Sequence, residues 1–597
     1  HKNSIKVDLL FKKFIALLLK WRILIFPDKI FLVITSIVIG ILSGLAAVVM
    51  KTSVQYMHEF LHSSFNDQYN TYLLALYPLI GIFLSAIFVQ KFRKGKLDRG
   101  IGNVIVEISN KRGVIAPHKL YSQLLSSFFT LGFGGSAGLE APISVTGAAI
   151  GSNTAWLLRM GERERKLLLG CGAAGGIAAI FNSPIAGVLF AIEILVTELA
   201  IPSFIPILIS SASATVISKI LYSGQPFKLI TNTWEIDSLP YYIALGILCS
   251  LLSLYIIKVY TGFQKFYKAR GRPYLKALTG GLVLGILLFI FPPLFGEGYN
   301  IVEAILNGKY QELFDRSVFW KEQNNIYFLL VYGFVIMMLK VIATSITVNS
   351  GGNGGMFGSS LFIGALFGFL FSRIVNISGM HNLIEVNFIV VAMAGILAGV
   401  IHAPLTAIFL IAEITGGYAL FIPLMVVVSL SYFITIYFEP FSVYTKAIAE
   451  RGEFILYNRD RMILENLRLS KLIEKDYIAL NQNDPLIKLI DAIEQSKRNI
   501  FPILDDEGNL VGIVLLDDVR EIIFEGDLYH LLLMKDMMTK PPAVIDLKEK
   551  MYDIVKKIDE LNVWNLPVVN GKKYIGFISK SRILSQYRRL LISQTEM

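Results

Sequence analysis

A single carboxylate lies in a glycine-rich stretch of the chain, between long apolar segments. The stretch is GGSAGLEAP, from Gly134 to Pro142, and the carboxylate is that of Glu140. A charged side chain at bilayer depth costs about 2.5–3.5 kcal/mol on insertion scales, so it needs a partner that stabilises it. The simplest alternative is that Glu140 only caps the helix that begins near Pro142.

A second glycine-rich stretch repeats the first one 217 residues later. GGNGGMFGS, which begins at Gly351, aligns with GGSAGLEAP, which begins at Gly134. Another pair of segments has nearly the same spacing: GGIAAIFNSPIAGVLFAIE (175–193) resembles GILAGVIHAPLTAIFLIAE (395–413), 220 residues later. Two matches in the same order predict two related halves, each with a glycine-rich break before a proline-marked helix.

Glycine-rich breaks inside a membrane segment leave backbone N–H groups without partners, and such groups cannot face lipid. A helix N-terminus binds anions through its free N–H groups. Two facing breaks, with Gly138 and Pro142 in one and Gly354 and Gly355 in the other, therefore predict an anion site built from backbone. Such a site suits permeation, because it must hold an ion and yet release it.

Glu140 adds a proton-dependent element to this predicted site. Its carboxylate can occupy the place of a permeating anion, and protonation would favour its release. The matching residue of the second half is Phe357. One half thus offers a blocking carboxylate, and the other half offers an aromatic pore wall.

The elements that must position these residues are those of an α-helical polytopic membrane domain. The chain is 54% hydrophobic and 17% charged, whereas soluble proteins carry about 25% charged residues. Runs such as IFLVITSIVIGILSGLAAVVM are long enough to cross about 30 Å of hydrocarbon. We expect a transmembrane domain at residues 29–445, with halves at roughly 29–222 and 240–440.

Much of the net charge of +11 lies in short basic clusters between the apolar runs, at residues 91–99, 159–166 and 268–276. Such loops mark the cytoplasmic side of a membrane, so nucleic acid is not an expected partner. Residues 1–28 mix Lys and apolar residues at helical spacing, which favours an amphipathic interfacial helix over a signal peptide. Cys171 and Cys249 lie in apolar segments and predict neither a disulfide nor a metal site.

The tail is a second domain with its own internal repeat. IFPILDDEGNLVGIVLLDDV, from Ile500, resembles NLPVVNGKKYIGFISKSRI, from Asn565, and each predicts a strand, a turn, a strand and a helix start. We expect a linker at 446–467 and an α/β domain at 468–597, divided into units at roughly 468–527 and 533–592.

With these motifs, the chain resembles the CLC chloride channel/transporter family with a C-terminal pair of CBS domains. By this resemblance GLEAP makes Glu140 the gating glutamate, and GGMFGS gives the backbone amides of Met356 and Phe357 to the central anion. FNSPIAGVLF also matches a family helix, and Tyr444 matches the pore tyrosine. The resemblance implies a homodimer in which each subunit has its own anion pathway, formed by two inverted halves.

The chain departs from the family's first signature, G-S-G-I-P, which here has the sequence DRGIGN. Arg99 stands in place of the anion-coordinating serine, followed by Gly100 and Ile101, and Gly102 replaces the proline. Arg99 either attracts anions at the inner vestibule or is a solvated charge of a cytoplasmic loop. Selectivity for chloride over other anions depends on which of these holds.

Two further departures concern protons. Proton-coupled members often carry an internal glutamate where this chain has Ile194, and the adjacent Glu193 is interpreted as structural because Glu413 is its repeat mate. This favours a channel, or an exchanger with another proton route. Leu139 and Ala141 replace a basic residue and a glycine beside Glu140, which makes the gate more apolar.

The CBS pair has incomplete nucleotide signatures. The typical ribose-phosphate motif needs a hydroxyl residue and an Asp; the first unit keeps Asp518 but has Leu515, and the second keeps Ser579 but has Arg582. An adenine nucleotide is one expected ligand, and a purely structural dimerisation module is the alternative. No cofactor or metal is expected to be required.

The leading hypothesis is therefore anion transport, of chloride or a similar ion and with protons as a second substrate in the exchanger case. We place the protein in the plasma (inner) membrane, with the CBS pair cytoplasmic. A CBS-regulated magnesium transporter would need several intramembrane carboxylates near a pore, but the apolar core has only isolated ones, chiefly Glu193 and Glu413. Without a GxSxG or HExxH motif or paired catalytic carboxylates, an enzyme is not expected.

Overall fold

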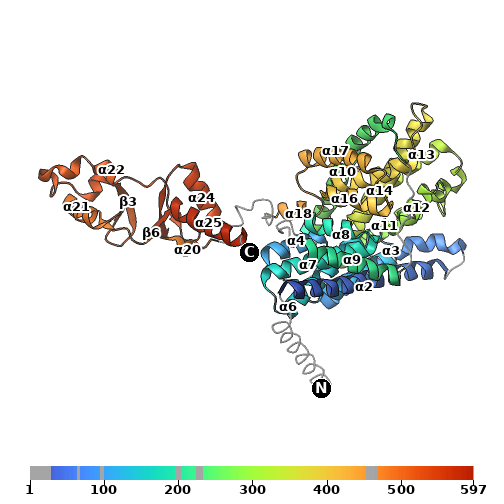
Figure 1. Ribbon diagram of the computed structural model, residues 1–597, viewed down its shortest axis with the longest axis horizontal. Coiled ribbons are helices and arrows are strands. Elements are labelled where there is room, and N and C mark those ends of the chain that lie inside the picture. Colours follow the sequence, from blue (N-terminus) through green and yellow to red (C-terminus); the bar gives the residue numbers. More distant parts are fainter. Residues whose placement is uncertain are drawn as a thin grey trace, which may run out of the picture. The chain divides into compact units, whose positions relative to one another are not determined.

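The structure is a computed structural model that describes residues 28–63, 67–93, 100–195, 204–222, 233–451, 464 and 467–595. The chain divides into two compact units, His1–Phe454 and Ile455–Met597 (Figure 1). The interfacial helix predicted for residues 1–28 lies outside the described residues except for residue 28. Residues 452–463 of the predicted linker also lie outside them.

The first unit is built from helices. Its first half contains α2 (Asp28–Ser63), α3 (Asp67–Arg93), α4 (Ile101–Asn110), α5 (Lys119–Gly132), α6 (Glu140–Leu157), α7 (Glu162–Phe181), α8 (Pro184–Phe190), the π-helical turn η1 (Ala191–Leu195) and α9 (Phe204–Leu221). Its second half contains α10 (Leu239–Ala269), α11 (Pro273–Ile290), α12 (Tyr299–Leu306), α13 (Ile326–Ser350), α14 (Met356–Ile377), α15 (Glu385–Ile401), α16 (Pro404–Ile414), α17 (Phe421–Phe438) and α18 (Lys446–Ala449). Short 3₁₀ turns are η3 (Ile236–Ser238), η4 (Pro292–Leu294), η5 (Tyr310–Phe314) and η6 (Trp320–Glu322).

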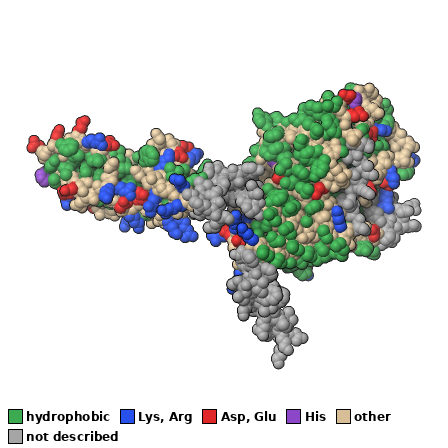
Figure 2. All heavy atoms as spheres, viewed as in Figure 1, with side chains coloured by type: hydrophobic (Ala, Val, Ile, Leu, Met, Phe, Trp, Pro, Cys, Tyr) green, Lys and Arg blue, Asp and Glu red, His purple; other side chains and the backbone are tan. Residues whose placement is uncertain are grey.

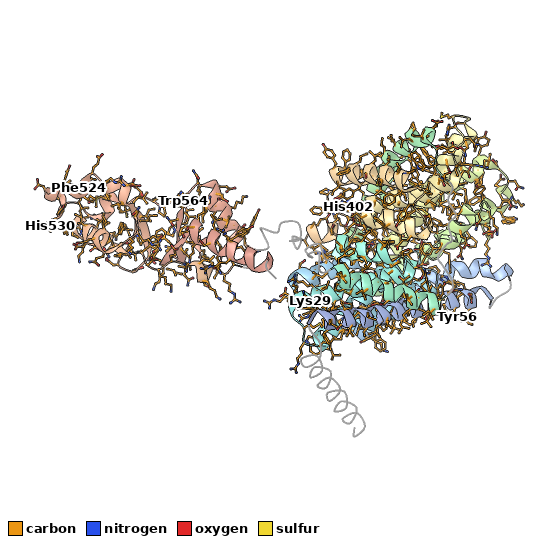
Figure 3. All side chains as sticks on the ribbon, viewed as in Figure 1. Lys29, Tyr56, His402, Phe524, His530 and Trp564 are labelled. Carbon is orange, nitrogen blue, oxygen red and sulfur yellow. The ribbon has the colours of Figure 1, made fainter. Side chains whose placement is uncertain are left out.

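The two halves repeat the same packing. Helix α6 packs on α7 as α14 packs on α15, and α7 packs on α8 as α15 packs on α16. Helices α7 and α15 also end alike. Each is followed by a residue in a left-handed backbone conformation, Asn182 with φ of 55° and His402 with φ of 58°; His402 is labelled in Figure 3. Corresponding helices of the two halves thus pack and end in the same way.

The surface of this unit is suited to lipid. Eight of the described helices are long and apolar enough to span a bilayer, and Figure 2 shows hydrophobic side chains over most of the visible face of this unit. The longest, α2, has 36 residues and a length of about 54 Å; Figure 3 labels Lys29 at its start and Tyr56 in its second half. The protein is thus an integral membrane protein that crosses the bilayer several times.

The inner helices pack closely because small residues line their contacts. From Leu167 to Phe181, every residue of α7 is buried. A Cβ atom added at Gly172 would lie 1.9 Å from the carbonyl oxygen of Gly147 in α6. The backbones of α6 and α7 are therefore in direct contact, which leaves no space for a side chain at this crossing.

The second unit is a small α/β domain with two similar halves. The first contains α20 (Leu469–Leu472), β1 (Leu480–Asn481), α21 (Leu486–Gln495), β2 (Ile500–Leu504), β3 (Leu510–Leu515), α22 (Leu516–Val519), η7 (Ile522–Phe524) and η8 (Gly526–Leu528). The second contains α23 (Met534–Met537), β4 (Ile545–Asp546), α24 (Met551–Glu560), β5 (Asn565–Asn570), β6 (Lys573–Ser579) and α25 (Lys580–Thr595). Each half has a three-stranded sheet, in the orders β1-β2-β3 and β4-β5-β6, with one parallel and one antiparallel pair. The predicted strand–turn–strand–helix order is confirmed in both.

The α6–α7 contact gives a test of the packing. We expect Gly172→Ala to lower the free energy of unfolding by about 1–3 kcal/mol or more, because the new methyl group forces the two backbones apart. Thermal unfolding of the protein in detergent measures this loss. Gly262→Ala in α10 is the matched control, since a Cβ at Gly262 meets no atom within 4 Å. Equal unfolding temperatures for the two variants would contradict the packing described.

Candidate functional site

The two glycine-rich breaks lie side by side and are hydrogen-bonded to each other. The amide of Gly138 donates to the carbonyl of Gly355 at 2.9 Å, and the amide of Gly355 donates to the carbonyl of Gly138 at 2.9 Å. These residues are 217 positions apart, which is the spacing of the sequence repeat. Such a reciprocal contact between equivalent positions is what a two-fold pseudosymmetry axis generates. It brings together the starts of α6 and α14.

Glu140 is the first residue of α6, and its side chain is fully buried. Oxygen Oε2 accepts a hydrogen bond from the amide of Gly358 at 3.2 Å, and Oε1 accepts one from the hydroxyl of Tyr299. Gly358 lies in the first turn of α14, where amides have no partner within the helix. The carboxylate thus occupies the anion-binding end of the helix from the other half. A Cβ at Gly138 would lie 2.0 Å from Oε2, so a side chain there would displace the carboxylate from this position.

The other residues predicted for the two breaks are buried at the starts of α6 and α14 or just before them. Pro142 is buried in the first turn of α6, and Met356 and Phe357 are buried at the start of α14. The Phe357 ring lies 5.5 Å from that of Phe181 and 6.2 Å from that of Phe190. Phe357 is therefore held in an aromatic group formed by the ends of α7 and α8. Gly354 precedes α14, and a Cβ there would lie 2.6 Å from the Cβ of Ala137 in the facing break.

Tyr444 contacts a third helix start. Its hydroxyl is buried and has no hydrogen-bond partner among the residues that the structure describes, and it lies within electrostatic range of Glu140. A Cβ at Gly102, in the first turn of α4, would lie 2.5 Å from the carbonyl oxygen of Tyr444. A side chain at position 102 would therefore collide with the backbone of Tyr444.

The departing signature is described from Gly100 onward. Gly100 precedes α4 in a left-handed conformation with φ of 80°, and Ile101 begins the helix and is fully buried. Their amides lie at a free helix start, as an anion-binding role requires. Arg99 lies outside the described residues, so its role as an anion attractor or a solvated charge stays a prediction.

Glu193 and Glu413 cap helices of the opposite half. Glu193, in η1, accepts hydrogen bonds from the amides of Leu405 at 3.0 Å and Thr406 at 2.7 Å, both in the first turn of α16. Glu413, in α16, accepts hydrogen bonds from two amides in the first turn of α8, at 3.0 and 2.9 Å. Both carboxylates are engaged in the same reciprocal way, which is the geometry of structural residues. Ile194, beside Glu193, is buried.

Sequence reasoning missed Tyr299 and Glu297. Tyr299 donates to the Glu140 carboxylate, and Oε1 of Glu297 accepts a hydrogen bond from the amide of Leu139 at 2.9 Å. Glu297 could have been found by the argument that singled out Glu140, because FPPLFGEGYN also places one carboxylate among glycines after an apolar run. No equivalent signal marks Tyr299.

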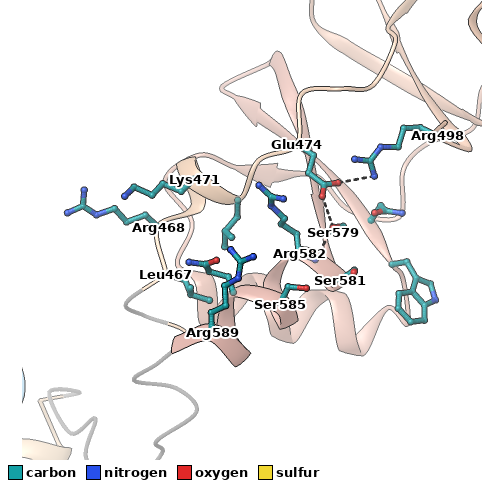
Figure 4. Close-up of a pocket in the computed structure, with 14 residues that line it drawn as sticks. Leu467, Arg468, Lys471, Glu474, Arg498, Ser579, Ser581, Arg582, Ser585 and Arg589 are labelled. Atoms are coloured by element: carbon teal, nitrogen blue, oxygen red, sulfur yellow. Dashed lines mark hydrogen bonds and ion pairs between the residues drawn. The ribbon is translucent and has the colours of Figure 1, made fainter. Parts of the chain in front are cut away.

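The second unit contains a basic cavity of about 800 Å³. Figure 4 shows Ser579 and Arg582 in it, with Glu474 bonded to Ser579 and to Arg498. The charged residues of the lining are Arg468, Lys471, Glu474, Arg498, Arg582 and Arg589. Five of these six are cationic, so the cavity is suited to an anionic ligand.

Two details limit what this cavity can bind. Hydrogen bonds from Arg498 hold the pKa of the nearby Asp476 below its usual range, so part of the positive charge of Arg498 is already compensated. Asp518 does not line the cavity: it lies in α22, in the first CBS unit, whereas Ser579 lies in the second, and it is exposed. The two groups that the nucleotide motif needs are thus separated between the two units.

Comparisons with known proteins agree with this geometry. Residues 80–435 match the model of the voltage gated chloride channel family, and residues 469–525 and 534–589 match that of the CBS domain. Because the first match covers more than half of the chain, the protein belongs to the voltage gated chloride channel family. The family assignment and the predicted fold class are confirmed, and the alternative of a magnesium transporter is not supported.

Similar curated proteins are transporters and channels. A putative chloride channel protein ClcB-like from Ralstonia nicotianae is 27% identical over 395 residues, which cover 63% of this chain and 86% of the relative. The H(+)/Cl(-) exchange transporter ClcA from Vibrio cholerae is 29% identical over 415 residues, which cover 66% and 83%.

Solved structures share the fold. A slow cyanobacterial Cl-/H+ antiporter aligns with a TM-score of 0.61 at 23% identity, over 72% of this chain and 99% of that chain. A eukaryotic CLC transporter aligns with a TM-score of 0.58 at 17% identity, over 92% and 97%. At these identities the likeness supports the architecture alone.

The reciprocal caps give a testable prediction. We expect Glu193→Ala and Glu413→Ala each to lower the free energy of unfolding by about 1–3 kcal/mol, because each leaves two helix-start amides without acceptors. Thermal unfolding in detergent measures this. The Gln variants are the controls: Gln keeps one acceptor oxygen and should give an intermediate loss. A Glu193→Gln variant with normal stability but altered proton dependence of transport would contradict the structural role.

Proposed function

We propose that the protein moves chloride or a similar small anion across a membrane through a pathway gated by Glu140. The observation that carries this proposal is the hydrogen bond from the Gly358 amide to the Glu140 carboxylate, at the start of α14. A carboxylate bound there occupies a position that a permeating anion would need. The family match and the names of the relatives support chloride as the ion.

The gating step follows from the charge of this carboxylate. While Glu140 is ionised, the partial positive charge at the start of α14 and the Tyr299 hydroxyl stabilise it in the pathway. Protonation removes that attraction, so the side chain leaves and an anion takes its place on the amides. The unpartnered hydroxyl of Tyr444 and the amides of Met356 and Phe357 then supply further donors to the anion.

The same gate serves a channel and a proton-coupled exchanger. Names of similar proteins, such as the exchange transporter ClcA, favour exchange. The chain itself has Ile194 where an internal proton acceptor is expected, and Glu193 is engaged in capping α16. An exchanger would therefore bring protons to Glu140 from the cytoplasmic side by another route. The reversal potential described below separates these two modes.

We further propose that Arg99 attracts anions to the inner entrance and that the protein is a homodimer with one pathway in each subunit. The basic clusters at 159–166 and 268–276 favour a cytoplasmic position for their loops and, with the chain that follows α18, for the CBS pair. The plasma (inner) membrane is the proposed location.

For the CBS unit, we propose that an adenine nucleotide binds in the basic cavity and regulates transport. The volume of about 800 Å³ lies in the range of small-molecule sites. Arg582 replaces the Asp that would bind the ribose, so the phosphate groups, bound by Ser579, Arg582 and Arg589, would dominate recognition.

The gate predicts a defined response to pH. In liposomes, we expect wild-type anion flux to rise on acidification by up to about tenfold per pH unit below the midpoint, as a single protonation requires. Glu140→Gln, which is permanently neutral, should make flux largely insensitive to pH. Glu235→Gln, at an exposed residue, is the control.

The same liposomes test the function itself. The reversal potential should follow the Cl⁻ gradient, and a steady shift with the proton gradient identifies an exchanger. Flux of Mg²⁺ without any anion flux would overturn the proposed function. Unchanged pH dependence in Glu140→Gln would overturn the gating role.

Nucleotide binding is measured on the full-length protein by calorimetry with ATP, ADP and AMP. We expect Arg582→Gln to weaken binding about tenfold or more, because a charge-assisted hydrogen bond contributes about 1.5–3 kcal/mol. Arg520→Gln is the matched control, at an exposed arginine that does not line the cavity. Absence of binding for all three nucleotides contradicts the proposal.

A further inference from the structure

The chain between α11 and α12, residues 292–298, reaches the start of the gating helix; we call it the outer loop. Its Glu297 accepts a hydrogen bond through Oε1 from the amide of Leu139, at 2.9 Å. Leu139 directly precedes Glu140 and is the N-cap residue of α6. A second carboxylate thus binds the helix that carries the gating carboxylate.

The outer loop is firmly fixed in this position. Lys340 of α13 is fully buried, and its Nζ donates to the carbonyls of Leu294 at 3.3 Å and Gly296 at 2.8 Å. The amide of Gly296 donates to the carbonyl of Gly134 in the first glycine-rich break, at 3.3 Å. The loop is therefore tied both to α13 and to the break, and the position of Glu297 follows from these contacts.

The outer loop lies on the side of the membrane away from the basic clusters. Helix α6 begins at Glu140 and ends at Leu157, next to the cluster at 159–166; α11 begins within the cluster at 268–276 and ends just before the loop. Glu140 is fully buried, whereas Glu297 is partly exposed. Glu297 is thus the more accessible of the two carboxylates.

Charged and titratable groups from several elements lie around Glu297. Glu140, Lys51 and Lys340 are within its electrostatic range. Tyr222 and Tyr299 are also within this range, and His58 contacts the outer loop through the ring of Phe295. Burial and the charge of Glu140 raise the pKa of Glu297 to about 8, whereas the Leu139 amide, Lys51 and Lys340 lower it. The two carboxylates are thus coupled, because each one, when ionised, repels the negative charge of the other.

We propose that Glu297 is a positioning residue of the gate: by holding the amide of Leu139 and placing a second negative charge near Glu140, it sets the pH at which the gate opens. This inference rests on the proposed gating role of Glu140. An ionised Glu297 makes protonation of Glu140 easier, because protonation relieves the repulsion between the two carboxylates. The negative charge of Glu297 also neutralises the partial positive charge at the start of α6, which would otherwise attract an anion.

The test is the pH profile of anion flux in liposomes for Glu297→Gln. Gln can still accept the Leu139 hydrogen bond, so this variant removes the charge and keeps the contact. We expect the flux midpoint to move to more acidic pH by about one unit, a tenfold higher proton concentration. Glu303→Gln is the matched control, at an exposed glutamate of α12, and its profile should equal that of the wild type.

Further variants keep each outcome decisive. The acidic shift should persist in a His58→Gln background, since His58 is the nearby group that ordinarily titrates close to neutral pH. In a Glu140→Gln background, Glu297→Gln should change nothing more in the pH profile. The inference is overturned if the pH profile of Glu297→Gln coincides with those of the wild type and Glu303→Gln. It is also overturned if Glu297→Gln no longer shifts the midpoint in the His58→Gln background. If Glu140→Gln itself keeps the wild-type profile, the proposed gating role fails instead.

Discussion

Two backbone hydrogen bonds, exchanged between Gly138 and Gly355, hold the rest of the pathway in place. They join the two glycine-rich breaks at equivalent positions of the two halves, so the starts of α6 and α14 face a common space. The Glu140 carboxylate reaches the α14 amide only because α6 begins two residues after this contact. A side chain at Gly138 would overlap that carboxylate, so the same glycine permits both the pairing of the breaks and the position of the Glu140 side chain.

Helix starts inside a membrane impose the second constraint, because their amides need acceptors that lipid cannot provide. Four glutamates meet this need: Glu140 binds the start of α14, Glu297 that of α6, Glu193 that of α16 and Glu413 that of α8. Glu193 and Glu413 each accept two amides. Glu140 shares its carboxylate between one amide and one hydroxyl.

Much of this arrangement could be predicted from the sequence, because the repeat placed related motifs at one spacing. The pairing of GGSAGLEAP with GGNGGMFGS identified Glu140, Met356 and Phe357, and the repeat of Glu193 in Glu413 indicated a structural role. Glu297 and Tyr299 were not predicted, since they lie almost 160 residues from Glu140 in a segment without a repeat motif. The fold brings Glu297 and Tyr299 close to Glu140, at the end of a loop whose carbonyl at Gly296 accepts a hydrogen bond from Lys340.

The helix caps formed by Glu193 and Glu413 also suggest how a chain with two related halves could have evolved. Each glutamate finds its amides in the other half, so neither half is complete by itself. A chain that consisted of one half would satisfy its helix starts only by pairing with a second copy in the opposite orientation. Duplication and fusion of such a gene would turn this exchange between subunits into contacts within one polypeptide, and would then free the two halves to diverge, as Glu140 and Phe357 have done.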